Sequence, residues 1–373
     1  MSKKLDNHKS IRLVHLISSL NIGGAEAMLV GLVDCLRNKD FQQYVLYFHN
    51  GPNVDRIRAL GIPVYQVKGF ICLYDPIFFF RLFFLLRRLK PDCLHTLLWA
   101  ANFAGRIIAR ILGIPVIAAL HNNIDQNGRI RIWLDRLTIS GANKIIAVSE
   151  GVKQSLLQYI PSKRIPEIEV IPNGIEAMSC RERGLQFCKK REEIGFSGHH
   201  FIIGSVGRFV NIKNYPLLIE QIPSLLGDYP HIRVVLIGTG PQEWYLTQKI
   251  KALDLEGYVR IINDTCALSY YPLFDCFILP SYKEGISMAL LEAMSFELPC
   301  VVGSYIPEHA VIKANKNGFI VTPKQSFGQI IRRLLEQPKL RQCLGNQAHI
   351  TVQKNFSRAT MVDSYVRLFR SYV

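Results

Sequence analysis

Residues 11–36 read IRLVHLISSLNIGGAEAMLVGLVDCL and set the pattern that the rest of the chain repeats. An almost continuous apolar run comes first, two glycines follow, and apolar residues at helical spacing complete the unit. A strand that is apolar on both faces is typical of a parallel sheet covered by helices on its two sides. The stretch therefore predicts a strand–turn–helix unit of a doubly wound α/β sheet.

The alternation of strand and helix patterns continues along the chain and restarts near its middle. In the first half, further strands are expected at residues 42–49, 62–67, 92–97, 115–121, 144–149 and 168–173. In the second half, strands are expected at residues 201–207, 231–238, 259–263, 276–281, 299–304 and 318–321. A chain of 373 residues is also too long for one ordinary hydrophobic core, so two domains are expected.

A polar, charged segment at residues 176–200 with few strand signals separates the two halves. We place the boundary near residue 178, which gives α/β domains at 1–178 and 179–355, both doubly wound. In open sheets of this kind, ligands bind beyond the carboxyl ends of the strands. The cleft between two such domains is therefore the expected site.

Composition narrows the class of protein. With 49% hydrophobic and 20% charged residues the chain is globular, and its net charge is +16. Residues 77–136 are especially basic, which suits nucleic acid, anionic lipid or a phosphorylated substrate. Nine cysteines without a C-x-x-C pair and a polar start predict free thiols in the cytoplasm. No apolar run is long enough to predict a membrane span.

Two glycines, Gly23 and Gly24, lie between the first strand and its helix. Glycine lets the backbone come close to a ligand, and a helix N-terminus offers free N–H groups to an anion. The spacing is not G-x-G-x-x-G, and no acidic residue ends the next strand, which disfavours a dinucleotide site. The alternative is a plain turn that needs glycine.

Two cations follow the first strand of the second half, in GSVGRFVNIKNYPLLIE (204–220). Arg208 and Lys213 at the carboxyl end of a strand suit a diphosphate, because Arg supplies a planar fork and Lys a point charge. Asn214 is expected to cap the helix that starts at Tyr215. The alternative is a pair of solvated loop cations.

The stretch SYKEGISMALLE (281–292) places two carboxylates, Glu284 and Glu292, around a predicted helix start. The backbone N–H groups of Gly285, Ile286 and Ser287 are free to bind an anion there. Carboxylates accept hydrogen bonds from hydroxyls, so one glutamate for a sugar and one for a ribose would match a nucleotide sugar. The alternative is an exposed, charged helix face.

His121 ends a predicted strand and is a candidate donor to a reacting hydroxyl or phosphate, the alternative being a structural histidine. His95, inside another strand, is expected to be structural. Pro172, Asn173 and Gly174 form a turn signal at the hinge of the expected cleft, or near the acceptor.

No metal-ligand spacing and no D-x-D occur, so neither a metal nor a cofactor is expected. G-x-S-x-G and the P-loop motif are absent as well.

These motifs together resemble glycosyltransferase family 4. They are SLNIGGAE, VIPNGI, GRFVNIKN, LIGTGP, LPSYKEGISMALLEAM and LPCVVGS, in the family's order, and the likeness runs from about residue 11 to 372. It implies a GT-B fold, with two Rossmann-like domains facing across a cleft and the helix at 356–373 crossing back to the first. It also implies metal-independent transfer of a sugar from a nucleotide donor, with retention at the anomeric carbon.

The resemblance also implies roles for the donor-side residues. Arg208 and Lys213 would hold the diphosphate, Glu284 would lie by the donor sugar, and Glu292 would reach the ribose.

In the first domain, the resemblance implies that Gly23 and Gly24 approach the phosphates and the acceptor, and that His121 contacts the donor sugar or acts in catalysis. Two positions depart from the family pattern: Ile286 stands where many relatives have Phe, and Asn122 where some have an acidic residue. Ile286 touches the donor pocket wall and leaves the choice of sugar open.

The segment YDPIFFFRLFFLLRRLK (74–90) is apolar on nearly every helical face and then basic. Such a helix is either buried in the core or dips into an anionic membrane interface. The second interpretation favours a saccharide or polyprenyl-linked acceptor at the inner face of the plasma membrane. A UDP-linked hexose or N-acetylhexosamine is the favoured donor, in bacterial surface polysaccharide or lipopolysaccharide assembly.

Two other functions remain open at this point. A nucleotide-sugar 2-epimerase shares the GT-B architecture and needs no acceptor. A basic nucleic-acid-binding protein would fit the charge, but the chain lacks a recognised nucleic-acid module, so no nucleic-acid partner is expected.

Overall fold

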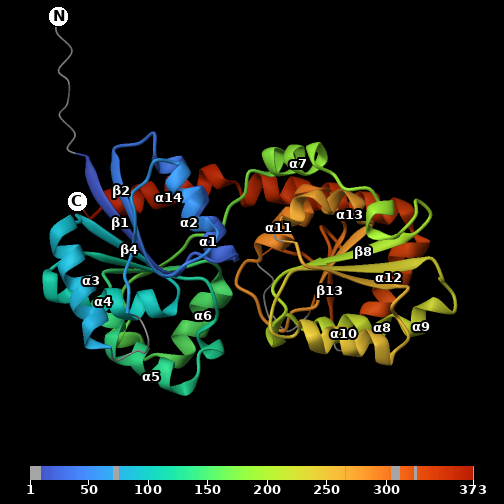
Figure 1. Ribbon diagram of the computed structural model, residues 1–373, viewed down its shortest axis with the longest axis horizontal. Helices are drawn as coiled ribbons and strands as arrows, with labels where there is room; N and C mark the ends of the chain where they lie inside the picture. Colours follow the sequence, from blue (N-terminus) through green and yellow to red (C-terminus); the bar gives the residue numbers. More distant parts are fainter. Residues whose placement is uncertain (1–9, 70–74, 265, 304–310, 323–325, 373) are drawn as a thin grey trace, which may run out of the picture. The chain divides into compact units, whose positions relative to one another are not determined.

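The computed structural model describes residues 10–69, 75–264, 266–303, 311–322 and 326–372 (Figure 1). Its contacts divide the chain into two compact units, one up to Asn173 together with the chain from Arg358, and one from Gly174 to Ser357. The division falls before the predicted residue 178, because helix α7 (Ala177–Gln186) packs into the second unit's core through Ala177 and Cys180.

The first unit is built on a seven-stranded parallel sheet in the order β3-β2-β1-β4-β5-β6-β7. Its strands are β1 (Ile11–Ser19), β2 (Phe41–His49), β3 (Val64–Gln66), β4 (Cys93–Leu97), β5 (Val116–Leu120), β6 (Lys144–Ala147) and β7 (Ile168–Val170). In the register of the central strands, His15 lies beside Val45 on one side and His95 on the other. The strand order reverses direction at β1 and β4, as a doubly wound sheet requires.

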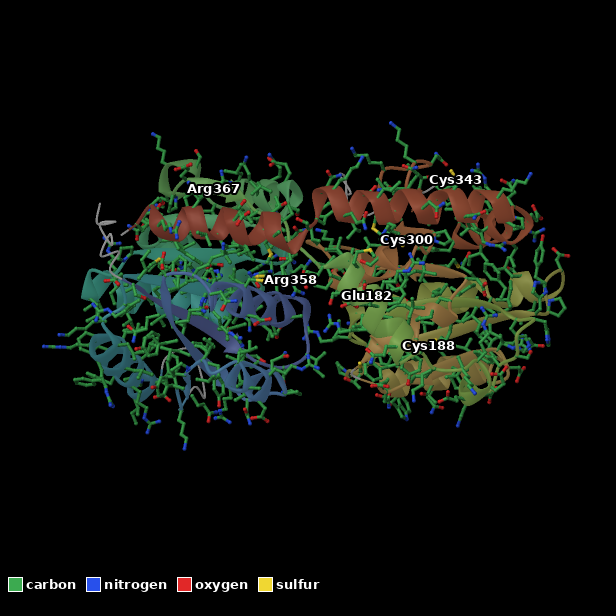
Figure 2. All side chains as sticks on the ribbon, turned by 90° about the horizontal axis from the view of Figure 1, so that it is seen from above. Glu182, Cys188, Cys300, Cys343, Arg358 and Arg367 are labelled. Carbon is green, nitrogen blue, oxygen red and sulfur yellow. The ribbon has the colours of Figure 1, made fainter. Side chains whose placement is uncertain are left out.

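Helices cover both faces of this sheet, and each face has its own hydrophobic core. The helices are α1 (Gly24–Leu36), α2 (Asn53–Ala59), α3 (Pro76–Leu89), α4 (Trp99–Leu112), α5 (Arg129–Thr138), α6 (Glu150–Tyr159) and α14 (Arg358–Arg370). Helix α14 joins the core with α1, and a side chain added at Gly31 of α1 would lie 3.1 Å from Nε of Arg358, labelled in Figure 2. The chain's last helix is therefore part of the first unit.

The second unit repeats the plan with a six-stranded parallel sheet in the order β10-β9-β8-β11-β12-β13. Its strands are β8 (Phe201–Val206), β9 (Ile232–Ile237), β10 (Val259–Ile262), β11 (Cys276–Leu279), β12 (Cys300–Gly303) and β13 (Phe319–Val321). With α7, its helices are α8 (Tyr215–Gln221), α9 (Pro223–Leu226), α10 (Glu243–Ala252), α11 (Met288–Ser295), α12 (Phe327–Glu336) and α13 (Pro338–Asn355). Two cores, one on each face of the sheet, complete the predicted doubly wound unit.

Two local predictions are wrong. Asn214 precedes α8 as expected, but its backbone is left-handed (φ 52°) and its side chain makes no capping bond. An N-cap needs extended backbone to aim its side chain at the helix. Of the two interpretations of residues 74–90, a helix buried on all faces is wrong, and the membrane-interface alternative stays a prediction. Residue 74 lies outside the described residues, and α3 buries only one side, formed by Phe78, Leu82 and Leu86.

Two composition-based expectations can be compared with the described residues. All eight cysteines among them are free thiols; Cys300 is buried in β12, and Cys188 and Cys343 are exposed (Figure 2). Within the same residues, no helix has both the length and the apolar character that crossing a bilayer demands.

Candidate functional site

Lys213 and Glu284 meet at the carboxyl edge of the second sheet. Strands β8 and β11 are neighbours there, and the loops that follow them are joined where the N–H of Tyr282 donates to the carbonyl of Ile212 at 2.9 Å. Lys213, in a 3-10 turn at Asn211–Lys213, places Nζ 2.5 Å from Oε1 of Glu284. The same oxygen accepts from the hydroxyl of Ser281 at 2.8 Å. The structure therefore brings two of the predicted donor-binding residues together.

Both charged groups of this ion pair keep hydrogen-bonding positions that their known partners do not fill. The side chains of Lys213 and Glu284 are 16% and 15% exposed, so the pair borders solvent. An ammonium carries three donors and a carboxylate about four acceptor positions, so both groups keep capacity for a ligand. The cation suits a phosphate and the anion a sugar hydroxyl. Arg208 follows β8 after Gly207, with its side chain exposed.

Three glycines that were not among the predicted site residues shape this edge. Gly207, Gly238 and Gly240 all have positive φ, at 154°, 149° and 159°. A Cβ at Gly238 would lie 2.0 Å from the carbonyl oxygen of Gly207, so the two turns are in direct contact. The N–H of Phe209 also donates to the carbonyl of Thr239 at 2.9 Å. The sequence pattern that could have indicated the second and third of them is G-T-G (238–240), which begins at the last residue of a predicted strand.

Substitution of Gly238 by Ala is expected to lower the free energy of unfolding by roughly 2–3 kcal/mol, because backbone strain adds to a clash with Gly207. Gly61→Ala is the matched control, since Gly61 also has positive φ (76°) but no neighbour within 4 Å. Its expected cost is about 1 kcal/mol. Chemical denaturation of both variants measures the difference, and equal losses would show that contact between the two turns contributes nothing.

Glu292 occupies a different environment from Glu284. Helix α11 begins after Ser287, whose hydroxyl accepts from the N–H of Leu290 at 3.4 Å, and Glu292 lies in its second turn. Oε2 of Glu292 accepts from the hydroxyl of Tyr271 at 2.8 Å. Burial raises the pKa of Glu292 to about 7, against the lowering effects of the Tyr271 hydrogen bond and the charge of Arg183. The exposed-face interpretation is therefore wrong for Glu292.

Tyr271 is a residue that sequence reasoning missed. It is fully buried in the second unit, and its hydroxyl lies 3.1 Å from the carbonyl of Ala289 as well as near Glu292. No periodicity or motif links it to Glu292, since the two are separated by 21 residues. Among the other predicted residues at this helix start, Ile286 buries its side chain in the second unit's core. Gly285 adjoins it in the loop before α11.

In the first unit, the glycine turn lies against an acidic side chain. Gly23 precedes α1 as predicted, whereas Gly24 is the first residue of the helix and not part of the turn before it. A Cβ at Gly23 would lie 2.3 Å from Oε2 of Glu26, which is buried in the first turn of α1. A carboxylate at a helix N-terminus is favourable, but it opposes the approach of a second anion. The turn therefore suits a hydroxyl-bearing ligand better than a phosphate.

His121 follows the last residue of β5 and is buried. Neither Nδ1 nor Nε2 has a hydrogen-bond partner within the described parts of the chain. Burial lowers the pKa of His121 to about 4, so the ring is neutral at pH 7 and offers one donor and one acceptor. Leaving both nitrogens unsatisfied is costly, which favours a ligand-binding role over a purely structural one. Asn122 beside it is exposed.

His95 lies in the core rather than at a strand end. Its Nδ1 is 3.0 Å from Nδ1 of His15, and both rings pack edge-on against aromatic side chains of α14. Burial lowers the pKa of both residues, for His15 to about 4. One nitrogen donates and the other accepts, so the hydrogen bond is lost if both rings are protonated, and burial makes even the first protonation unfavourable.

Acidification is therefore expected to destabilise the first unit. Between pH 6.5 and 4 the unfolded chain protonates His15 while the folded chain does not, so stability that is complete above pH 6.5 is lost as the pH falls. His15 contributes a loss of about 3 kcal/mol. Urea titrations at several pH values measure the loss, and His15→Phe should flatten its pH dependence. A variant that keeps the wild-type pH dependence would contradict this origin.

Asn173 is buried at the end of the first unit, one residue before Gly174. Ile175 forms a parallel β-bridge with Ser357. The two segments that connect the units are therefore held together at the points where they belong to the second unit. Within the described residues, no group of three His, Cys, Asp or Glu side chains could hold a metal ion. The approach of Gly23 and His121 to Lys213 and Glu284 stays a prediction.

Comparisons with known proteins match a family model to each of the two units. The model of Glycosyltransferase Family 4 matches residues 22–178, and that of Glycosyl transferases group 1 matches residues 186–350. The putative glycosyltransferase EpsF of Bacillus subtilis is 26% identical over 316 residues, or 81% of each chain. An Escherichia coli UDP-Gal:alpha-D-GlcNAc-diphosphoundecaprenol alpha-1,3-galactosyltransferase is 24% identical over 344 residues, or 84% of each chain.

The solved structure of Anabaena HepE in complex with UDP-glucose superposes with a TM-score of 0.82 at 20% identity. The match covers 97% of this chain and all of HepE. It confirms the predicted GT-B type of fold, with two Rossmann-like units.

Proposed function

Because the chain belongs to glycosyltransferase family 4, we propose that it transfers a hexose or N-acetylhexosamine from a UDP-sugar to a saccharide or polyprenyl-linked acceptor, with retention. The observation that carries this proposal is the Lys213–Glu284 pair at the carboxyl edge of the second sheet. It sets a phosphate-binding cation beside a hydroxyl-binding anion, which matches the two chemically different parts of a nucleotide sugar. HepE was solved with UDP-glucose, which supports the choice of donor.

The leaving diphosphate gains negative charge as the glycosidic bond breaks. Lys213, Arg208 and the N–H groups of residues 285–287 would stabilise that charge as preorganised positive groups. This assignment needs no metal ion, since the two side chains and the start of α11 supply the positive charge.

The sugar gains oxocarbenium character in the same step. The acceptor hydroxyl attacks from the face that the diphosphate leaves, and its proton passes to the departing phosphate oxygen. No covalent enzyme intermediate is formed, so Glu284 orients the sugar through its hydroxyls rather than attacking it. His121 is neutral and has two open ring nitrogens, which suits a hydrogen bond to the donor sugar or the incoming hydroxyl.

In this proposal Glu292 binds the ribose and Tyr271 positions Glu292. An ionised carboxylate accepts from two vicinal hydroxyls, and the Tyr271 hydroxyl holds the carboxylate in place. On the first unit, Gly23 and Glu26 are assigned to the acceptor, because the carboxylate there favours a hydroxyl over a second phosphate.

The acceptor is proposed to be lipid-linked or a growing saccharide of the bacterial cell surface, including lipopolysaccharide. The Escherichia coli relative is named for a diphosphoundecaprenol acceptor, which supports this class. We place the protein in the cytoplasm, peripheral on the anionic inner face of the plasma membrane. The basic helices of the first unit are consistent with that location.

Calorimetric titration with a panel of nucleotide sugars tests the donor assignment. UDP-glucose, UDP-galactose and UDP-N-acetylglucosamine are expected to bind more tightly than ADP- or GDP-sugars. Product analysis without acceptor separates transfer from epimerisation, since an epimerised sugar formed under these conditions would contradict the transferase. Binding of DNA or RNA in place of every nucleotide sugar would contradict it as well.

A further inference from the structure

Helix α3 exposes a row of large apolar side chains. Ile77, Phe80 and Phe84 are 58%, 64% and 62% exposed. They lie three and four residues apart, so they share one side of the helix, opposite the side that packs into the core. Single exposed apolar residues are ordinary, but an ordered row of them marks an interaction surface.

Helix α5 exposes a second row of the same kind. Ile130, Trp133 and Leu137 are 66%, 55% and 51% exposed, again at spacings of three and four residues. Helix α4 packs against both α3 and α5, so the three helices form one layer over the sheet (Figure 1). Ile111, at the end of α4, is 66% exposed as well. The two rows therefore belong to one helical layer.

The exposed charges of this layer all have one sign. Its exposed cations are Arg81, Arg87, Arg88, Lys90, Arg110, Arg129, Arg131 and Arg136. The only acidic residue within α3, α4 and α5 is Asp135, which is buried and paired with Arg106. Asp75, the half-buried residue that caps α3, is an acidic neighbour, so the layer presents its apolar side chains within a large excess of positive charge.

We propose that α3 and α5 together dock the protein on an anionic bilayer, with the two apolar rows inserted at the headgroup level. Helices with apolar rows flanked by Arg and Lys bind such an interface by combining burial with electrostatic attraction. Trp133 suits the depth where an aromatic ring is half in lipid and half in water. Aliphatic side chains such as Ile130 and Leu137 gain nothing from a nucleic-acid backbone, and two copies of this positive face would repel each other.

This docking surface deepens the proposed function and rests on its membrane-bound acceptor. Arg129, the first residue of α5, follows His121 by eight residues. The short segment between them includes the 3-10 turn Ile124–Gln126, held by a hydrogen bond from the N–H of Ile124 to Ser155 at 3.0 Å. The first residue of the docking helix α5 is therefore joined by a short, anchored segment to His121, the candidate contact of the donor sugar or the incoming hydroxyl.

Flotation of the full chain with vesicles tests the surface. Phosphatidylglycerol vesicles at low salt are expected to carry the protein, and phosphatidylcholine vesicles are not. The triple variant Phe80→Gln, Phe84→Gln, Trp133→Gln should partition at least about tenfold more weakly. The double variant Arg87→Gln, Arg88→Gln should lose about fivefold per residue at low salt and little at high salt.

Matched controls come from exposed aromatic residues of the second unit. Phe187 and Trp244 are 66% and 73% exposed, and the variant Phe187→Gln, Trp244→Gln should partition as the wild type does. UDP-glucose titration of each variant checks that the donor site is intact. Vesicle binding without UDP-glucose binding would overturn the proposed function and leave the docking surface standing.

Three results would overturn the docking surface. The first is wild-type protein that fails to float with phosphatidylglycerol vesicles. The second is a triple variant that floats as well as the control. The third is wild-type self-association that the triple substitution abolishes, without any vesicle binding, which would assign the rows to a second copy of the chain.

Discussion

Replacing Lys213 by Met is expected to lower the rate of sugar transfer by about 10²–10³-fold, at little cost to the fold. The ammonium lies 2.5 Å from Glu284 at the carboxyl edge of the second sheet, where we place the donor diphosphate. Loss of one preorganised charge-stabilising group costs roughly 3–4 kcal/mol in the barrier. Steady-state rates with the donor identified by calorimetry measure the effect, and Arg208→Ala and Glu284→Gln are expected to lose turnover as well.

Lys249 offers a matched control for this substitution. Its Nζ lies 2.5 Å from Oε1 of Glu220, and its side chain is 18% exposed, against 16% for Lys213. Lys249→Met therefore removes a lysine of similar exposure and pairing distance from the same unit, with the more exposed partner Glu220 (48%), without touching the proposed site. If both variants lose activity equally, the effect reflects lost ion pairing in general and the assignment of Lys213 to the diphosphate is wrong.

The affinity for UDP-glucose is expected to fall about 100-fold between pH 8 and pH 5. Burial raises the pKa of Glu292 to about 7, so the carboxylate is ionised above pH 7 and protonated below it. If the ribose needs the ionised form, affinity is complete above pH 7 and falls about tenfold per pH unit below it. UDP-glucose is the proper probe, because neither of its phosphates carries the second ionisation, near pH 6, of a terminal phosphate.

Two variants separate Glu292 from other titrating groups. Glu292→Gln should bind UDP-glucose weakly at every pH, with the step near pH 7 removed. Tyr271→Phe should move the step to higher pH, because the Tyr271 hydrogen bond lowers the pKa of Glu292. A step that survives in Glu292→Gln would show that another group titrates, and that Glu292 does not hold the ribose.

Local patterns in the chain were enough to predict the two sheets. Strands such as Ile11–Ser19 and Phe201–Val206 are apolar at most positions and on both faces, which is the pattern of a parallel strand buried on both faces. The glycine turn before α1 and the helix α11 after the loop of Glu284 followed from short-range signals too, each start being predicted to within one residue. These features depend on neighbours within a few residues, so sequence reasoning reaches them.

Contacts between distant segments were not predictable in this way. Tyr271 meets Glu292, and Glu26 lies against Gly23, only because the folded chain brings their elements together. The exposure of Phe80 and Phe84 was only one of two open interpretations, for a related reason. Apolar residues on every side of a helix predict burial, but the sheet has room to cover only one side of α3.

The central claim is tested most directly by the binding energy that the two phosphates add, which is the difference between the binding energies of UDP and uridine. Calorimetry of uridine and of UDP with the wild type is predicted to show that the two phosphates strengthen binding by at least about 100-fold, through charge-assisted hydrogen bonds. In Lys213→Met that increment should shrink by about tenfold or more, while in Lys249→Met it should be unchanged. An increment of the same size in all three proteins would show that the diphosphate binds elsewhere, and the proposed site would be wrong.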